Sequence, residues 1–296
     1  MAAALAGALL CSAPAFPHPD TPRRLAEVAR ELEQKPGDPE LLYRRGCLLL
    51  DEEYADYPQA LKDLTEALKA PGIKDVRLYR GTALLRTGDV RAALRDLDRY
   101  VREAPGDAHG FERRSEARVA SHDPHGAIAD LQAAIRLAPR ADLYSRCAHL
   151  QVEAGLASAA IQSYEDGIAA LNAPLELLVA GVDLATAHGA HDKALAWLTV
   201  IESRGGRREG WVLRRAQVLD KAGRTGEARA GYGEVLALLG ARAAGGGFLS
   251  PTMRLEQAQA LLGLGRREEA RSIAAALAAT MKGRPEYERL AEALGP

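Results

Sequence analysis

Apolar residues recur every three or four positions between Lys74 and Asp107. The first run carries Leu78, Gly81, Leu84 and Leu85, and the second carries Ala93, Leu97 and Val101. A glycine turn at Gly88 separates the runs, and Pro105-Gly106 ends the second one. This spacing predicts two short amphipathic α-helices that fold into a hairpin. We expect Gly81 and Ala93 to let the two backbones approach closely while Leu97 fills the space beside them.

The same hairpin pattern recurs along nearly the whole chain. Small residues equivalent to Ala93 follow one another at intervals of 33, 34, 33, 34, 34 and 42 residues: Ala60, Ala93, Ala127, Ala160, Ala194, Ala228 and Ala270. The position four residues later is large and apolar in six of these seven repeats: Leu64, Leu97, Leu131, Tyr164, Leu198 and Tyr232. The turn glycine recurs as well: Gly88, Gly155, Gly189, Gly223 and Gly265. The pattern resembles the tetratricopeptide repeat (TPR), a helical hairpin of about 34 residues.

This resemblance implies an all-α, right-handed α-solenoid of about seven repeats with a cap helix at each end. We expect a signal peptide over 1–15, the N-terminal cap over 16–37 and repeats 1–6 over 38–239. Asp38 and Pro39 are a typical helix start for the first repeat. A glycine-rich loop over 240–250 and the seventh repeat with the C-terminal cap over 251–296 complete the chain. We expect Phe248, within that loop, to dock onto the array.

Composition excludes some function classes. The chain of 296 residues has 39 Lys+Arg against 40 Asp+Glu, a formal net charge of −1. This near-balance gives no overall field for a polyanion, so no nucleic-acid partner is expected. The apolar residues are chiefly Ala and Leu, which suits helix-on-helix packing. Apart from the N-terminal segment, no apolar run approaches the roughly 20 residues of a transmembrane helix.

The N-terminal segment has features of an export signal. An apolar run from Ala2 to Leu10 precedes Ala13-Pro14-Ala15, which is typical of a cleavage site. The run is short and lacks a preceding Lys or Arg, so a disordered tail on a cytoplasmic protein is the alternative. We expect export to the periplasm or beyond, with cleavage after Ala15 or lipidation of Cys11 both open. The other cysteines, Cys47 and Cys147, lie three repeats apart, so no disulfide is expected between them.

Arginine and aspartate occur together at two positions of the first three repeats. An arginine precedes the small residue of the first helix, and an aspartate precedes the large residue of the second: Arg45 with Asp63, Arg80 with Asp96, and Arg114 with Asp130. Both are absent from the fourth, fifth and seventh repeats, while Arg215 of the sixth faces Gly231. This joint occurrence predicts a two-pronged ion pair across each hairpin, with a structural role.

The resemblance places the binding surface on the concave face, which the first helices form. Helical phase assigns eight side chains to this face: Arg44, Tyr79, Arg86, Arg113, Arg146, His149, Arg214 and Gln217. Arginine and tyrosine are frequent anchors of interfaces. An extended peptide with acidic side chains is one interpretation, and a solvated, charge-balanced groove is the other. Some family members clamp a terminal carboxylate with lysine and asparagine, but Tyr43, Cys47 and Tyr79 occupy those positions here.

Few residues of the sequence are candidates for metal binding or catalysis. His122 and His125 form one cluster, and His188, His191 and Asp192 form another, but neither has the ligands of a zinc site. Nucleophile elbows, phosphate loops and dinucleotide motifs are absent from the sequence. We therefore expect a monomeric, non-catalytic scaffold without cofactor or metal that binds a protein or peptide. The alternatives are an accessory subunit of an enzyme or envelope assembly machine carried on another chain, and a solenoid with its own catalytic groove.

Overall fold

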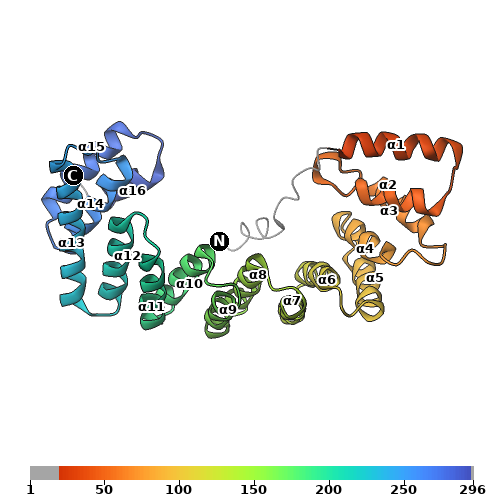
Figure 1. The fold of residues 1–296 in the computed structure, drawn as a ribbon, viewed down its shortest axis with the longest axis horizontal. Helices are drawn as coiled ribbons and strands as arrows, with labels where there is room; N and C mark the ends of the chain where they lie inside the picture. The colour runs from red at the N-terminus through yellow and green to blue at the C-terminus, as the bar shows by residue number, and fades with distance from the viewer. Residues whose placement is uncertain (1–19, 295–296) are drawn as a thin grey trace. The chain divides into compact units, whose positions relative to one another are not determined.

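The computed structural model describes residues 20–294, and these residues are almost entirely helical. Sixteen α-helices and one short 3₁₀-helix follow one another without a strand in this described range. Successive helices pack as antiparallel pairs, so the predicted all-α fold of about seven hairpins is confirmed (Figure 1). Residues 1–19, with the predicted signal peptide and Cys11, lie outside the described residues.

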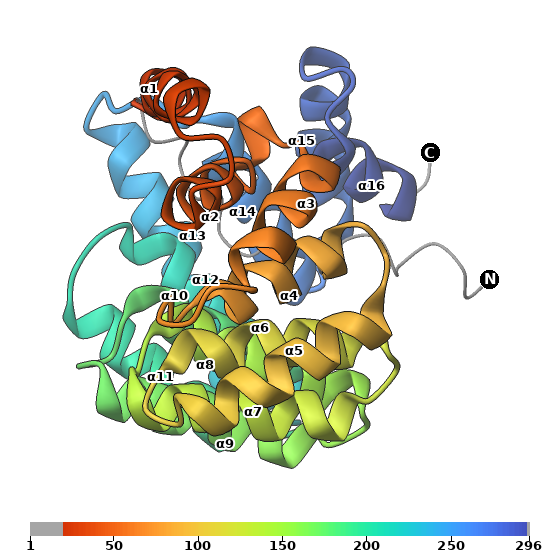
Figure 2. The same cartoon turned by 90° about the vertical axis from the view of Figure 1, so that its right-hand side faces the viewer.

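The N-terminal unit, which ends at Leu171, contains one cap helix and four hairpins. Helix α1 (Thr21–Gln34), within the predicted N-terminal cap, packs on α2 and buries Val28 and Leu32. The hairpins are α2 (Pro39–Leu48) with α3 (Tyr57–Ala67), α4 (Val76–Arg86) with α5 (Val90–Glu103), α6 (Ala108–Ala120) with α7 (Pro124–Leu137), and α8 (Ala141–Glu153) with α9 (Ala157–Ala170). The stacking of neighbouring hairpins in this unit can be followed in Figure 2.

The C-terminal unit begins at Asn172 and contains three hairpins and a closing helix. The hairpins are α10 (Leu175–Ala187) with α11 (His191–Ser203), α12 (Arg208–Lys221) with α13 (Thr225–Ala244), and α14 (Pro251–Gly263) with α15 (Arg267–Thr280). Helix α16 (Pro285–Leu294) packs on α15, as predicted for the C-terminal cap. First helices of neighbouring repeats also contact each other, for example α12 and α14.

Helix ends follow the chemistry of their residues. The Asp38 carboxylate accepts hydrogen bonds from the backbone N–H groups of Glu40 and Leu41, and so caps α2. The turn glycines all adopt the left-handed conformation, with φ between 73° and 90°: Gly88, Gly155, Gly189, Gly223 and Gly265. Side chains are strained in this conformation, which explains why glycine recurs at the turn.

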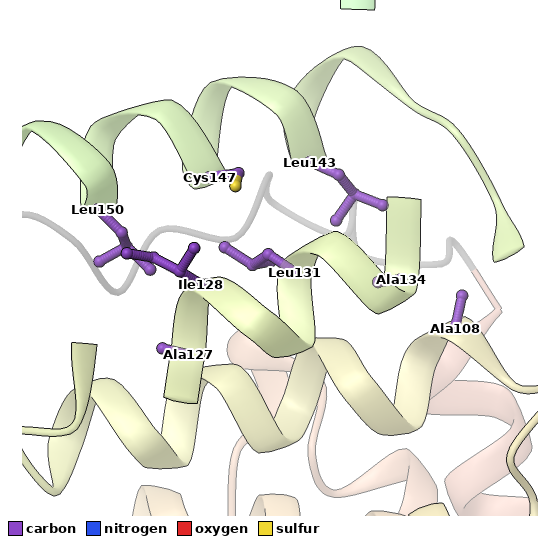
Figure 3. Close-up of a cluster of buried hydrophobic side chains, with 8 residues drawn as sticks. All are labelled: Ala108, Ala127, Ile128, Leu131, Ala134, Leu143, Cys147 and Leu150. Carbon is purple, nitrogen blue, oxygen red and sulfur yellow. The ribbon is translucent and has the colours of Figure 1, made fainter. Parts of the chain in front are cut away.

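Small residues bring the two helices of a hairpin together. A Cβ atom added to Gly81 would lie 2.8 Å from Cγ of Leu97, and one added to Gly46 would lie 2.6 Å from Cγ of Leu64. Both leucines are fully buried. Between repeats the core continues from one hairpin to the next, as Figure 3 shows for the cluster that joins α6, α7 and α8: Ala108, Ala127, Ile128, Leu131, Ala134, Leu143, Cys147 and Leu150.

Two expectations for the glycine-rich segment are wrong. Helix α13 runs on to Ala244, so the first part of 240–250 is helical rather than loop. Ala and Arg favour a helix there, and the helix ends only at the three glycines from Gly245 to Gly247. Phe248 does not dock but is 77% exposed, because the residues just before it, 240–247, are all exposed and offer it no apolar surface.

Candidate functional site

The three arginine–aspartate pairs are present inside the first three hairpins. Nε and Nη2 of Arg45 donate to the two carboxylate oxygens of Asp63 at 2.6 and 2.8 Å. The corresponding distances are 2.6 and 2.7 Å for Arg80 with Asp96, and 2.9 and 2.6 Å for Arg114 with Asp130. Each aspartate is buried, whereas 14–27% of each arginine side chain is exposed. The carboxylate is therefore the partner that depends on the pair.

The three aspartate carboxylates differ in their second side-chain partner. Arg118 places Nη1 3.0 Å from the Asp130 carboxylate, and Arg77 places Nη1 3.7 Å from that of Asp96. Asp63 has a neutral second partner, the Gln59 side-chain amide, which donates at 2.7 Å. Arg45 is thus the one cation within ion-pair distance of Asp63, among the described residues.

Other contacts occupy the same pair of positions in later hairpins. In the fourth, the Ser163 hydroxyl lies 3.9 Å from the Cys147 sulfur. In the fifth, Gly181 lies against the ring of Trp197, and a Cβ atom there would come within 2.9 Å of it. In the sixth, Arg215 faces Gly231 and instead donates to the Glu202 carboxylate of the preceding hairpin at 2.8 and 2.9 Å.

We use the name first-helix face for the surface formed by the first helices within each unit. Most predicted arginines of this face contact a carboxylate of the chain itself. Arg44 lies 3.7 Å from Glu31 of α1, and Arg146 donates to Glu116 of the preceding repeat at 3.2 Å. Arg214 likewise pairs with Asp183 of the preceding repeat. These arginines therefore join neighbouring repeats, whereas the Arg–Asp pairs join the two helices within a repeat.

The remaining predicted residues have varied surroundings. Arg113 donates to Glu116 at 3.0 Å, and Arg86 lies 3.8 Å from Glu52. His149 is exposed on α8. Tyr79 packs edge-on against Tyr43, with ring centroids 5.7 Å apart.

The first-helix face of the N-terminal unit contains a polar hollow of about 370 Å³. Three predicted residues line it together: Tyr79, Arg86 and Arg113. Its floor includes Tyr100, whose hydroxyl hydrogen-bonds the Asp107 carboxylate at 2.6 Å. Burial and this carboxylate raise the pKa of Tyr100, so the phenol stays protonated at neutral pH. Nearby Cys47 is also protonated, because burial raises the pKa of its thiol to about 12.

The first-helix face of the C-terminal unit has a larger hollow of about 810 Å³, between α10, α12 and α14. Arg214 and Gln217 of the predicted set line it, together with Trp211 and Leu175. Burial lowers the pKa of the Arg214 guanidinium. Glu256 is a lining residue that the predicted set does not include. It occupies in α14 the position of Arg214 in α12, 42 residues earlier, and this equivalence is visible in the sequence only when the last repeat is aligned across its longer interval.

Glu256 is 8% exposed and pairs with Arg207 through Oε1. Its Oε2 is buried without a hydrogen-bond partner among the described residues. Removal from water raises the pKa of this carboxyl, the nearby Glu209 adds to the effect, and Arg207 opposes it. Glu209 itself is buried beside Arg242, whose Nη2 lies 3.4 Å away.

Metal-ligating side chains do not cluster in the part of the chain that the structure describes. Within 20–294, no group of three or more His, Cys, Asp and Glu side chains could hold a metal ion. Cys47 and Cys147 are both free thiols. None of the described helices is both long enough and apolar enough to cross a membrane.

Comparisons with known proteins find similarity in structure alone. No protein-family model and no curated protein matches the chain. Among solved structures, the chain is similar to one of Naa15/Naa10 bound to HypK-THB, with a TM-score of 0.51 and 16% identity, over 93% of this chain and 38% of that one. It is also similar to a tetratricopeptide repeat protein from Parabacteroides merdae ATCC 43184, with a TM-score of 0.46 and 14% identity, over 86% of this chain and 98% of that one. The similarity to MamA from Desulfovibrio magneticus RS-1 has a TM-score of 0.46 and 22% identity, over 51% of this chain and 85% of that one.

The fold can be identified from the repeat itself. A hairpin of two helices recurs with a spacing near 34 residues, a small residue lies where the helices meet, and each hairpin packs on the next within its unit. These are the defining features of the tetratricopeptide repeat. The chain therefore has the fold of tetratricopeptide repeat proteins.

Proposed function

We propose that the chain is a non-catalytic scaffold that binds an extended segment of a partner protein on its first-helix face. The observation that carries this proposal is the pair of hollows on that face. Tyr79 and Arg113 line the one in the N-terminal unit, and Trp211 and Arg214 line the one in the C-terminal unit. Aromatic and arginine side chains that border a hollow are the usual anchors of a protein interface.

Charge pairing limits what the partner segment can gain from the arginines. Arg44, Arg146 and Arg214 each contact a carboxylate of the chain already. An incoming carboxylate has to replace that partner, and exchanging one ion pair for another yields little net free energy. Apolar contacts and hydrogen bonds in the hollows therefore supply most of the affinity.

The absence of catalysis is part of the proposal. Acid–base catalysis by carboxylates typically uses two groups with different pKa values that face one site. Glu256 has the one raised carboxyl pKa in the described range, and Glu209 beside it does not line the hollow. An accessory subunit for an enzyme on another chain fits the same surface. Recovery of one enzyme in fixed stoichiometry with the chain would favour that alternative.

Site-specific photo-crosslinking tests the binding face. We would place a photo-crosslinking residue at Tyr79 or Gln217 on first helices, and at exposed Arg95 or Arg229 on second helices as controls. Crosslinking in the cell should join a partner to the first pair and not to the second. Crosslinks from Arg95 and Arg229 alone would overturn the proposed face.

We also propose that the chain is exported, on the features of residues 1–15. Sequencing the N-terminus of the mature protein tests this directly. A start at Phe16 indicates an exported form cleaved after Ala15, and lipidated Cys11 indicates membrane attachment. An intact Met1 contradicts export through this segment.

A further inference from the structure

The hollow of the C-terminal unit has the composition of a site for one class of peptide, if the proposed function holds. Its walls come from α10, α12, α14, the end of α11 and the turn before α12. Its volume of about 810 Å³ exceeds that of a single side chain, so it has room for a side chain and adjoining backbone. This hollow is more than twice as large as the one of 370 Å³ in the N-terminal unit.

One side of the hollow is apolar. Leu175, at the start of α10, is 48% exposed, which is unusual for a leucine in this chain. Half-buried Trp211 and Leu255 continue the apolar wall. The wall is open because Gly205 and Gly206 in the preceding turn carry no side chain. An exposed apolar wall around an open hollow is typical of a contact site for an apolar side chain.

The mouth of the hollow is cationic. Arg204 and Arg207, in the turn before α12, are exposed. Glu256, the one carboxylate in the described lining, is buried and engages Arg207 through a single nitrogen, Nη2. Arg204 donates to a carbonyl oxygen, that of Asn172, at 3.3 Å. Both guanidinium groups therefore retain N–H donors that face solvent, since a guanidinium has five.

We propose that this hollow binds a partner segment in which an apolar side chain is flanked by Asp or Glu. The apolar side chain lies against Trp211 and Leu175. The flanking carboxylates accept hydrogen bonds from Arg204 and Arg207. Arg204 donates to a backbone carbonyl oxygen, and Arg207 keeps further exposed N–H donors beside its pair with Glu256, so an acid can bind both without displacing Glu256.

Fluorescence anisotropy with a synthetic peptide tests the chemistry of the occupant. The probe is a fluorescein-labelled GSDDFDDSG peptide, added to the full chain at low salt. Two control peptides replace either the phenylalanine by serine or the four aspartates by lysines. The probe should bind at least about tenfold more tightly than either control, because each control peptide lacks either the apolar contact or the contacts to the arginines. Equal binding of all three, or no binding of the probe, overturns the proposal.

Matched variants of the chain test the location. Leu175→Ser and Arg204→Glu should each weaken the probe at least about tenfold. Leu137→Ser replaces a leucine of similar exposure, 43%, in the N-terminal unit. Arg208→Glu makes the same charge change four residues from Arg204, but Arg208 points to Glu234, which it contacts at 2.6 Å, and does not line this hollow. All four sites are exposed, so folding should persist, and circular dichroism checks it.

The controls Leu137→Ser and Arg208→Glu should bind the probe within about twofold of the unchanged chain. Equal losses in the controls and the test variants would overturn the proposed location. The failure of this inference differs from the failure of the proposed function. If a partner crosslinks through Gln217 while the Leu175→Ser variant binds the probe as tightly as the unchanged chain, the scaffold function is supported. In that case the proposed binding of an acid-flanked apolar segment in this hollow is wrong.

Discussion

The hairpins of the N-terminal unit and those of the C-terminal unit reach the same geometry with different interior contacts. In α2 to α7, a buried aspartate and an arginine join the two helices of each hairpin. In α10 and α11, Gly181 and Trp197 occupy those positions, and the contact is van der Waals packing. The hairpin therefore does not require the ion pair. What both regions share is the fully buried alanine of the second helix, such as Ala93 and Ala194.

The difference extends to the surface. Where the sixth hairpin lacks the aspartate, at Gly231, Arg215 is free to pair with Glu202 of the preceding hairpin. A hollow of about 640 Å³ lies there, lined by Gly231, Trp211 and Arg215. In the C-terminal unit, Trp211 thus lies between two hollows. The sixth hairpin, which lacks the ion pair, therefore borders two hollows of the C-terminal unit.

The largest effect should follow from removing Arg45, the one cation that the described residues place within ion-pair distance of Asp63. Arg45→Leu should lower the free energy of unfolding by about 3–5 kcal/mol, because it leaves a buried carboxylate with an amide as its one partner. Arg114→Leu should have a smaller effect, since Arg118 still reaches Asp130. Chemical denaturation measures the loss of unfolding free energy, and hydrogen exchange in α2 and α3 shows where the structure is weakened. Equal losses for the two variants would contradict the interpretation of Asp63.

Replacing both members of the pair controls for the side chains themselves. Arg45→Leu with Asp63→Leu should be clearly more stable than Arg45→Leu alone, because no buried charge is left. A double variant as unstable as the single one would mean that packing, and not the uncompensated carboxylate, sets the loss. The same comparison applies to Asp96→Ala against the joint replacement of Arg80 and Asp96.

In the fifth hairpin, the contact that replaces the ion pair should be nearly as important. Trp197 is 7% exposed. Trp197→Ala should cost about 3 kcal/mol, through lost apolar burial and the cavity that it leaves. Hydrogen exchange should accelerate in α10 and α11 first. Salt should not change this loss, whereas a loss that depends on salt would contradict a packing contact.

The close approach inside a hairpin should be measurable at Gly81. Gly81→Ala should cost about 1–3 kcal/mol, because the new methyl group would lie 2.8 Å from Cγ of buried Leu97. Gly106→Ala is the control, since a Cβ atom there has no neighbour within 4 Å. If the two alanines are equally tolerated, the small residue at the first position is not needed for packing.

The smallest expected change in the free energy of unfolding is a gain in stability rather than a loss. Gly233 lies within α13, and a Cβ atom there meets nothing within 4 Å. Gly233→Ala should therefore stabilise the C-terminal unit by about 0.5–1 kcal/mol, because alanine loses less backbone entropy in a helix. A thermal shift measurement suffices. A destabilised variant would show that α13 needs glycine at this position for a reason other than packing.

The sequence was enough to predict the hairpins, since Gly81, Ala93 and Leu97 belong to a pattern that recurs with one period. The joint occurrence of Arg80 and Asp96 was informative because both disappear together in later repeats. Periodicity within a repeat says nothing about contacts between repeats. The pairing of Arg146 with Glu116, 30 residues apart, depends on how one hairpin stacks on the next, and so it was not predicted.

Two misses have local causes. Glu256 was overlooked because the last interval is 42 residues, which hides its equivalence to Arg214. The helical extension of α13 was overlooked because three glycines dominated the prediction for 240–250, although Ala241 to Ala244 are good helix formers. Phe248 comes directly after the three glycines and is exposed to solvent.

Hydrogen exchange on the full chain with its crosslinked partner is the most direct test of the binding face. The account predicts that the partner slows exchange in first helices, above all in α10, α12 and α14, while α11, α13 and α15 stay unchanged. Slower exchange confined to the second helices would contradict the account.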